Sequence, residues 1–423
     1  MLETACKAAQ TIERPAARGQ ALSAIAETWL SAGETSRGQT TIEEALKVAD
    51  LLKHPDEKAR QLAWLARLLK ETGDTSKAIE QFKRAYYLAR AAESVSLKVN
   101  ALYNLSSEYV DAGLPAESKT VLAELELMVL DPASEVDTVC ELINMAEIYI
   151  DLEEAAEAAK ILTMAVQSAH ALKDVWFKAE RLIEIAEIDN SAGYRDEAAR
   201  LVQEALSEVE HIEENSRPYF WMKLAAVCSE LDLKTQSADC LLKAREAILK
   251  SADLPTAAGD VLELAENYLN LDDRITSLDL LEKAQTIIGD LPEDQDRIQC
   301  LLQSADLYRK LGQAPQAGVL TEKVYQLCTW ETDHKAKLYT LGKLAILNVN
   351  LNKLPEASEL VDEITRLAAE SKTRTSGLGP IGEELTEAGA DGLGLILGEI
   401  IREPEVKVSV LIAAAQNQIK KKA

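Results

Sequence analysis

The sequence predicts an all-α solenoid, a single stack of antiparallel helix hairpins, and three observations carry this prediction. A pattern of small and apolar residues recurs about every 40 residues through most of the 423-residue chain. Aromatic residues make up only 4% of the chain, so the core must be built from Leu, Ile, Val and Ala, which favours packed helices over sheets. Proline avoids the predicted helix interiors and stands at helix starts or before them.

Each repeat is organised around a turn position that ends its first helix. Small residues stand seven residues before and five residues after this position, and apolar residues stand eleven before and nine after, with Thr321 as the exception. The second repeat shows the pattern with Ala66, Ala78, Leu62 and Phe82. Glycine suits the turn because it adopts a left-handed conformation at little cost. In four repeats it is present, as Gly33, Gly73, Gly113 and Gly193.

The pattern continues where the glycine is lost and gives nine repeats in all. In the sixth repeat the small positions are assigned to Ala226 and Ala238, and the apolar positions to Met222 and Leu242. Small side chains let two antiparallel helices approach closely where they cross. A lone hairpin cannot bury both of its faces, so stacked hairpins are expected to share one continuous core.

Numbered along one repeat, these small residues occupy positions 8, 15 and 20, so the chain resembles a tetratricopeptide-repeat array over residues 14–371. The period of about 40 is longer than the family's usual 34, which implies longer helices. The resemblance implies a right-handed superhelix with a concave groove. Two further family positions support it. Position 11 is aromatic in Trp29, Tyr109, Tyr149, Tyr268 and Tyr308. Position 27 is alanine in Ala45, Ala85, Ala165, Ala205 and Ala284.

Both ends of the chain extend the array. Residues 1–13 are expected to form an N-terminal capping helix, similar to a second helix whose preceding partner is missing. Residues 372–423 are expected to form a degenerate tenth repeat, built on Gly382, Gly389 and Gly394, and then a C-terminal capping helix. Atypical terminal units are expected as caps of a repeat array.

Charge and composition exclude several functions. The net charge of −25 argues against binding nucleic acid, which needs a basic surface. No apolar run approaches the roughly 20 residues that span a bilayer, and the N-terminus shows no signal peptide. Six dispersed cysteines indicate reduced, mostly buried thiols and a cytoplasmic protein. They are Cys6, Cys140, Cys228, Cys240, Cys300 and Cys328.

Motifs for catalysis, metals or cofactors are weak. The stretch Gly377–Gly382 matches G-x-G-x-x-G, but helical repeat sequence precedes it instead of a strand, so a linker and a repeat position explain it better. No Cys/His cluster has zinc-site spacing. Cys228 and Cys240 lie on neighbouring helices and could approach each other, but buried free thiols are favoured. We therefore predict no catalytic residue, cofactor or metal, and no enzymatic activity.

The resemblance implies that repeat positions 5 and 9 line the concave groove. Four repeats carry an aliphatic residue at position 5 and an acid at position 9, which lie on one helix face. An apolar floor with acidic walls suits a basic amphipathic segment. The alternative is that position 5 is buried and position 9 is a solvated acidic face. The predicted groove residues are Tyr103, Ile143, Glu147, Ile183, Glu187, Leu262, Glu266, Leu302 and Asp306.

The leading functional prediction is a non-catalytic scaffold that binds a partner protein or peptide in this groove. A first alternative is a regulatory sensor whose superhelix binds a peptide or small ligand. A second is an enzyme-associated subunit that uses the glycine-rich C-terminal stretch. The identity of the partner, its pathway and the oligomeric state stay open, because repeat arrays serve many tasks.

Overall fold

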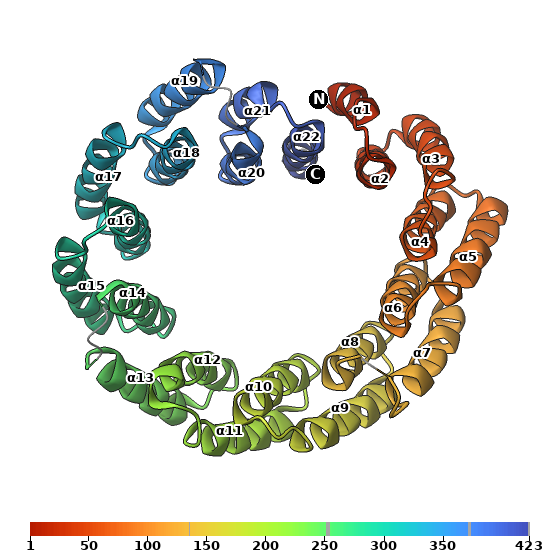
Figure 1. Ribbon diagram of the computed structural model, residues 1–423, viewed down its shortest axis with the longest axis horizontal. Coiled ribbons are helices and arrows are strands. Elements are labelled where there is room, and N and C mark those ends of the chain that lie inside the picture. Colours follow the sequence, from red (N-terminus) through yellow and green to blue (C-terminus); the bar gives the residue numbers. More distant parts are fainter. Residues whose placement is uncertain (135, 251–253, 371–373, 422–423) are drawn as a thin grey trace. The chain divides into compact units, whose positions relative to one another are not determined.

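The computed structural model describes residues 1–134, 136–250, 254–370 and 374–421, and every regular element in them is a helix. The predicted all-α architecture of stacked antiparallel hairpins is confirmed. The chain divides into two compact units, with unit 1 formed by Met1–Val136 and Cys328–Ala423 and unit 2 by Asp137–Leu327. Within each unit the even-numbered first helices line the concave side, and the odd-numbered second helices cover their outer side (Figure 1).

Unit 2 contains five hairpins. Its first helices are α8 (Thr138–Asp151), α10 (Val175–Ser191), α12 (Arg217–Glu230), α14 (Leu254–Asn270) and α16 (Asp294–Lys310). Its second helices are α9 (Ala155–His170), α11 (Arg195–Val209), α13 (Lys234–Ile248) and α15 (Arg274–Gly289), and α17 (Ala314–Thr329) ends at the unit boundary. A short 3₁₀ turn at Glu214–Ser216 precedes α12.

Unit 1 joins the first and last parts of the chain. Its first helices are α2 (Pro15–Ser31), α4 (Pro55–Glu71), α6 (Val95–Asp111), α18 (His334–Asn350) and α20 (Gly379–Glu387). Its second helices are α3 (Thr35–Ala49), α5 (Thr75–Arg90), α7 (Pro115–Val129), α19 (Leu354–Glu370) and α21 (Asp391–Ile400). Helices α1 (Leu2–Gln10) and α22 (Pro404–Lys420) complete the unit, and a 3₁₀ turn at Ser376–Leu378 precedes α20.

The two helices of a hairpin cross where both carry small residues. The Ser277 hydroxyl, on α15, donates a hydrogen bond of 2.7 Å to the carbonyl of Ala265 on α14. In the third hairpin the hydroxyls of Ser106 and Ser118 are 2.8 Å apart. These residues hold positions 8 and 20 of their repeats, so the small side chains bring the two backbones within hydrogen-bonding range.

Left-handed residues close the hairpins at the predicted turn position. After α4, the Gly73 N–H donates to the carbonyl of Lys70 and the Asp74 N–H donates to that of Leu69, each at 3.0 Å. This pattern satisfies carbonyls that the helix end leaves free. Six of these turns use glycine, at Gly33, Gly73, Gly113, Gly193, Gly312 and Gly389. Four use other residues with φ near +60°, at Glu153, Asp232, Asp272 and Asn352.

The sixth hairpin corrects the predicted register by one residue. Its turn is Asp232, and the Ser237 hydroxyl donates to the Ala225 carbonyl at 2.8 Å, so these residues form the helix crossing. The assignment of Ala226, Ala238 and Leu242 to buried positions was wrong, because all three are exposed. Leu242 is 50% exposed. The pattern allowed both registers because each small position has a second small residue beside it.

Replacing Glu153 by Gly should stabilise unit 2. A residue with a side chain costs roughly 1–2 kcal/mol in the left-handed region, and glycine removes this cost. Glycine also makes the unfolded chain more flexible, which offsets part of the gain, so we expect the free energy of unfolding to rise by about 0.5–1 kcal/mol. Urea denaturation followed by circular dichroism measures this gain. Gly73→Ala is the matched control, because an added Cβ meets no atom there within 4 Å and only the backbone cost remains. That control should lose about 1 kcal/mol, and a loss in Glu153→Gly would contradict the prediction.

Helices α22 and α1 form a hairpin from the two ends of the chain. They pack together, and α22 also packs on α2 and α20, which places it in the layer of first helices (Figure 1). Helix α1 has the pattern of a second helix, since its buried residues Leu2, Ala5 and Ala9 stand 40 residues before Ile42, Ala45 and Ala49. The partner that the sequence analysis found missing before α1 is therefore α22.

Glycines in the last hairpin allow close packing of α20, α21 and α22. A Cβ on Gly394 would lie 2.6 Å from the carbonyl oxygen of Gly382 in the facing helix. A Cβ on Gly379 would collide with Val406 of α22, and one on Gly382 would lie 3.0 Å from Val410. Helix packing therefore accounts for Gly379 and Gly382 of the G-x-G-x-x-G match.

Candidate functional site

The predicted groove residues lie on first helices, Tyr103 in unit 1 and the other eight in unit 2. At position 5, Ile183 and Leu262 are completely buried and Ile143 is 9% exposed, whereas Tyr103 and Leu302 are half-buried. The three buried side chains belong to the helix packing and offer almost no surface to a partner. What remains accessible on this face of unit 2 is mainly the acids at position 9.

The acids near the end of unit 2 are already neutralised. Glu266 pairs with Lys310 at 2.6 Å, and Asp306 pairs with Arg309 at 2.7 Å and with Lys310 at 3.2 Å. Such exposed pairs add little stability, but they compete with a partner's cations. Helices α14 and α16 therefore present a nearly neutral surface at position 9.

The acids at position 9 of α8 and α10 carry no ion pair within the described residues. Burial raises the pKa of Glu147, and the neighbouring Asp151 raises it further. Burial also raises the pKa of Glu187, which Lys223 counteracts only in part. Both carboxylates are half-buried and neither has an ion-pair partner close enough to neutralise it, so a cation placed beside either of them would be bound favourably.

Four aromatic residues, which sequence reasoning did not single out, gather at the starts of α10 and α12: Trp176, Phe177, Tyr219 and Phe220. The rings of Trp176 and Tyr219 are parallel at 6.2 Å, and Phe220 meets Trp176 edge-on at 5.2 Å. Phe177 and Tyr219 are 50% and 40% exposed. The cluster holds four of the chain's 19 aromatic residues. The sequence contained a signal for this cluster, because aromatic residues stand next to each other at Trp176–Phe177 and Tyr219–Phe220 in a chain that has few of them.

Helix α10 places the aromatic cluster and the acids on one face. Trp176, Glu180, Glu184 and Glu187 follow one another at spacings of four, four and three residues, which makes one stripe along the helix. The Tyr219 hydroxyl donates to Glu180 at 3.4 Å, so α12 extends the same surface. We call the surface formed by Glu147, the α10 stripe, Phe177 and Tyr219 the acidic–aromatic face.

Most of the negative charge belongs to unit 2. Residues 137–327 contain 37 acidic and 18 basic residues, a net charge of −19, which leaves −6 for all of unit 1. The field over unit 2 therefore attracts cations to the same unit that carries the acidic–aromatic face.

Other kinds of site find little support. Among the described residues no group of three or more His, Cys, Asp or Glu side chains is placed to hold a metal. Within the same residues no helix is long and apolar enough to cross a membrane. Cys228 and Cys240 are buried free thiols, and their mutual hydrogen bond lowers the pKa of Cys228 and raises that of Cys240.

No protein-family model and no curated protein matches the chain. Among solved structures, a protein from Thermococcus onnurineus NA1 is 17% identical, with 90% of this chain and 95% of that chain covered and a TM-score of 0.33. A Podosopora anserina putative kinesin light chain with nearly identical TPR-like repeats is 19% identical over 55% and 96%, with a TM-score of 0.28. A Rap protein complexed with Competence and Sporulation Factor is 15% identical over 85% and 99%, with a TM-score of 0.32.

These superpositions are loose, and the class of the protein follows from its own repeats. The 40-residue pattern, the left-handed turn and the contact between positions 8 and 20 show an all-α array of stacked helix hairpins that is similar to tetratricopeptide-repeat arrays. On the acidic–aromatic face, Glu184 pairs with Arg181 at 2.6 Å and Glu180 pairs with Lys223 at 3.9 Å, whereas Glu147 and Glu187 have no ion pair within the described residues.

Proposed function

We propose that the protein is a non-catalytic scaffold that binds a basic, partly apolar segment of another protein on the acidic–aromatic face. The observation that carries the proposal is the pair of carboxylates without an ion pair among the described residues, Glu147 and Glu187, in a unit with a net charge of −19 and two exposed aromatic rings. We also propose that it works in the cytoplasm, where its six free thiols stay reduced.

The chemistry of the face favours lysine or arginine interleaved with apolar residues. A cation beside Glu147 or Glu187 relieves the repulsion from neighbouring acids and gains charge-assisted hydrogen bonds. Lys223 already lies over the Tyr219 ring, 5.4 Å from its centroid. A partner's cation over the face of Trp176 gains roughly 0.5–2 kcal/mol more, and Phe177 offers apolar contact. Because bound cations lower the pKa of both carboxyls, binding should release protons and strengthen as the pH rises toward 7.

Charge reversal tests this proposal. Glu147→Lys with Glu187→Lys should weaken binding of an amphipathic Lys/Leu peptide by at least about 100-fold, because each change replaces an attraction by a repulsion. Isothermal titration calorimetry at two salt concentrations measures the effect. Any partner that co-purifies with the protein is then measured in the same way.

The control carries the same charge change on the outer helices of unit 2. Glu157→Lys with Asp196→Lys alters two exposed acids on α9 and α11 and should weaken binding only a few-fold through the overall field. Glu266→Lys should also have a small effect, because Lys310 already neutralises that carboxylate. If these two controls lost as much affinity for the peptide as the variant with Glu147→Lys and Glu187→Lys, net charge alone would attract the peptide and the proposal would be wrong.

A further inference from the structure

A cavity of about 640 Å³ lies on the concave side of unit 1, and all of its lining residues belong to that unit. Side chains from α2, α4, α6 and α22 line it. Its volume is in the range of small-molecule sites, which are about 300–1,000 Å³. The cavity depends on the hairpin formed by the chain ends, because α22 supplies one of its walls.

The middle of the cavity is apolar. Ala17, Ala21 and Ala24 of α2 form a floor of small side chains, and Trp64 of α4 and Ile412 of α22 add larger surfaces. The indole N–H of Trp64 has no acceptor among the described residues. This region suits a flat or branched apolar group.

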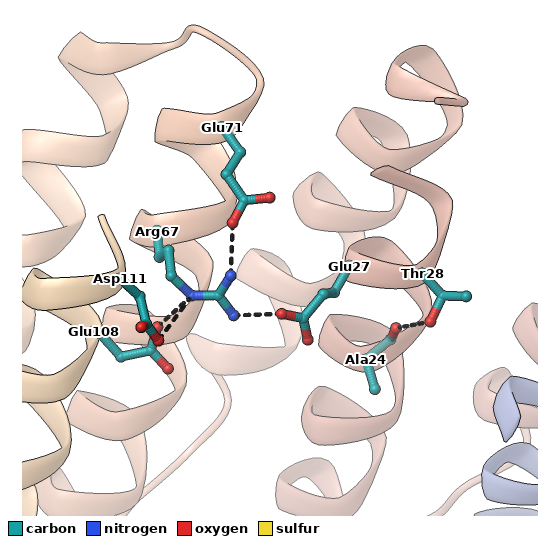
Figure 2. Close-up of polar contacts among 7 residues, drawn as sticks. All are labelled: Ala24, Glu27, Thr28, Arg67, Glu71, Glu108 and Asp111. Atoms are coloured by element: carbon teal, nitrogen blue, oxygen red, sulfur yellow. Dashed lines mark hydrogen bonds and ion pairs between the residues drawn. The ribbon is translucent and has the colours of Figure 1, made fainter. Parts of the chain in front are cut away.

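Glu108 makes part of the cavity wall acidic, and Figure 2 shows the carboxylates that gather with it around Arg67. Glu108 lines the cavity and accepts a hydrogen bond from the Arg67 Nε at 2.7 Å. The two terminal nitrogens of Arg67 form ion pairs with Glu27 and Glu71, each at 2.6 Å. Asp111 stands 4.0 Å from the same guanidinium. One positive charge thus faces four carboxylates, and burial raises the pKa of Glu108 despite Arg67. The negative charge of these four carboxylates is therefore only partly neutralised by Arg67.

The arginines that line the cavity are already paired. Arg14 binds Glu405 at 3.3 Å, and Arg60 binds the buried Asp56 at 3.5 Å. Among the charged residues that line the cavity, Glu57 has no ion pair within the described residues and Glu108 shares the single charge of Arg67 with other carboxylates. The remaining charge is therefore negative, and a cation fits better than an anion.

We propose that this cavity binds an organic cation with an apolar body, a primary amine or guanidinium compound, and that the bound cation holds α22 against α2. The cationic group lies beside Glu57 or Glu108, and the apolar body packs on Trp64, Ile412 and the alanine floor. This goes beyond the proposed binding of a protein partner, because it concerns a small ligand and the other unit.

The link to α22 follows from the walls of the cavity. Glu405, Val408, Ser409 and Ile412 lie on α22, and the opposite walls belong to α2, α4 and α6. No peptide bond joins α22 to α1 or α2, so their packing is an equilibrium between closed and open arrangements. A ligand that contacts both sides binds only the closed arrangement and shifts the equilibrium toward it.

Calorimetry with the full chain and three matched probes tests the proposal. Phenethylamine should bind at least about ten-fold more tightly than phenethyl alcohol, and phenylacetate should bind most weakly. Hydrogen exchange should show amides of α1 and α22 protected by phenethylamine, with unit 2 unchanged. Equal binding of the amine and the alcohol, tighter binding of phenylacetate, or no amine binding up to about 10 mM would each overturn the proposal.

Two variants locate the site. Ser409→Trp places a large side chain in the cavity from an exposed position and should weaken phenethylamine binding at least ten-fold. Thr40→Trp, at an exposed position outside the cavity, is its control and should bind like the parent. Glu57→Gln keeps the shape and should weaken the amine about five-fold while leaving the alcohol unchanged. Unchanged amine binding in both Ser409→Trp and Glu57→Gln would show that the amine binds elsewhere.

Discussion

Ala9→Glu is expected to destabilise unit 1 by more than about 3 kcal/mol, the cost of burying a carboxylate and overpacking a helix contact. Ala9 has no exposed surface and lies on α1, which packs against both α2 and α22. Inserting a charged side chain there should therefore separate the first and last helices of the chain. Denaturation by urea, followed by circular dichroism, measures the loss.

Ala8→Glu is the matched control, because Ala8 is the preceding residue of the same helix and is partly exposed. It makes the same chemical change and should cost less than about 1 kcal/mol. Hydrogen exchange should further show that Ala9→Glu exposes the amides of α22, more than 390 residues away in the sequence. If only α1 lost protection, the two ends would be independent caps, as the sequence analysis expected.

The sequence predicted the repeats well because each depends on local chemistry. Small residues at positions 8 and 20 and a left-handed turn recur every 39 or 40 residues, and the structure places them at the helix crossings. The register was missed only in the sixth hairpin, where Ala225 and Ala226 both fit a small position. A local sequence pattern cannot show which of two adjacent small residues faces the helix crossing. The packing of the partner helix determines which one does.

The hairpin of α1 and α22 could not be predicted because its two halves lie at opposite ends of the chain. The sequence showed that the N-terminal helix resembles a second helix and that a capping helix closes the C-terminal end. Each half alone has the pattern expected of a cap. Their contact depends on how the intervening hairpins bring the ends together, and no short-range pattern encodes that.

The candidate site was predicted in part. The acids at position 9 were identified, but the pairing of Glu266 and Asp306 with Lys310 required coordinates. The burial of Ile183 and Leu262 reflects helix–helix packing that a repeat pattern cannot separate from groove exposure. The aromatic cluster was missed because Trp176 and Phe177 stand before the numbered repeat positions of α10.

Asp189 should make unit 2 less stable as the pH rises from 4 to 7. It holds position 11 of its repeat, where Tyr109 and Tyr149 stand in the two preceding repeats. It is 2% exposed, and its Oδ2 has no hydrogen-bond partner within the described residues. Burial raises the pKa of Asp189 from 3.8 to about 7, which Glu197 reinforces and Arg200 opposes. The free-energy cost of ionising this buried carboxyl therefore lowers the stability of the fold between pH 3.8 and about pH 7.

The sign follows from proton binding. Between pH 4 and 7 the folded chain keeps a proton on Asp189 that the unfolded chain has lost, so unfolding becomes easier by roughly 1 kcal/mol per pH unit. Asp189→Asn removes this titrating group. The difference in free energy of unfolding between this variant and the parent should be near zero at pH 4, and at pH 7.5 the variant should be more stable by a few kcal/mol. Asp189→Tyr should gain as much or more, because it restores the repeat's aromatic contact.

Urea denaturation at pH 4.5, 6 and 7.5 measures the difference between each variant and the parent, so that slopes from other titrating groups cancel. Asp196→Asn, an exposed acid on the adjacent α11, is the control and should track the parent at every pH. A constant difference between Asp189→Asn and the parent would contradict the prediction, because a packing effect does not vary with pH. A difference that grows with pH requires that Asp189 titrates in the folded core.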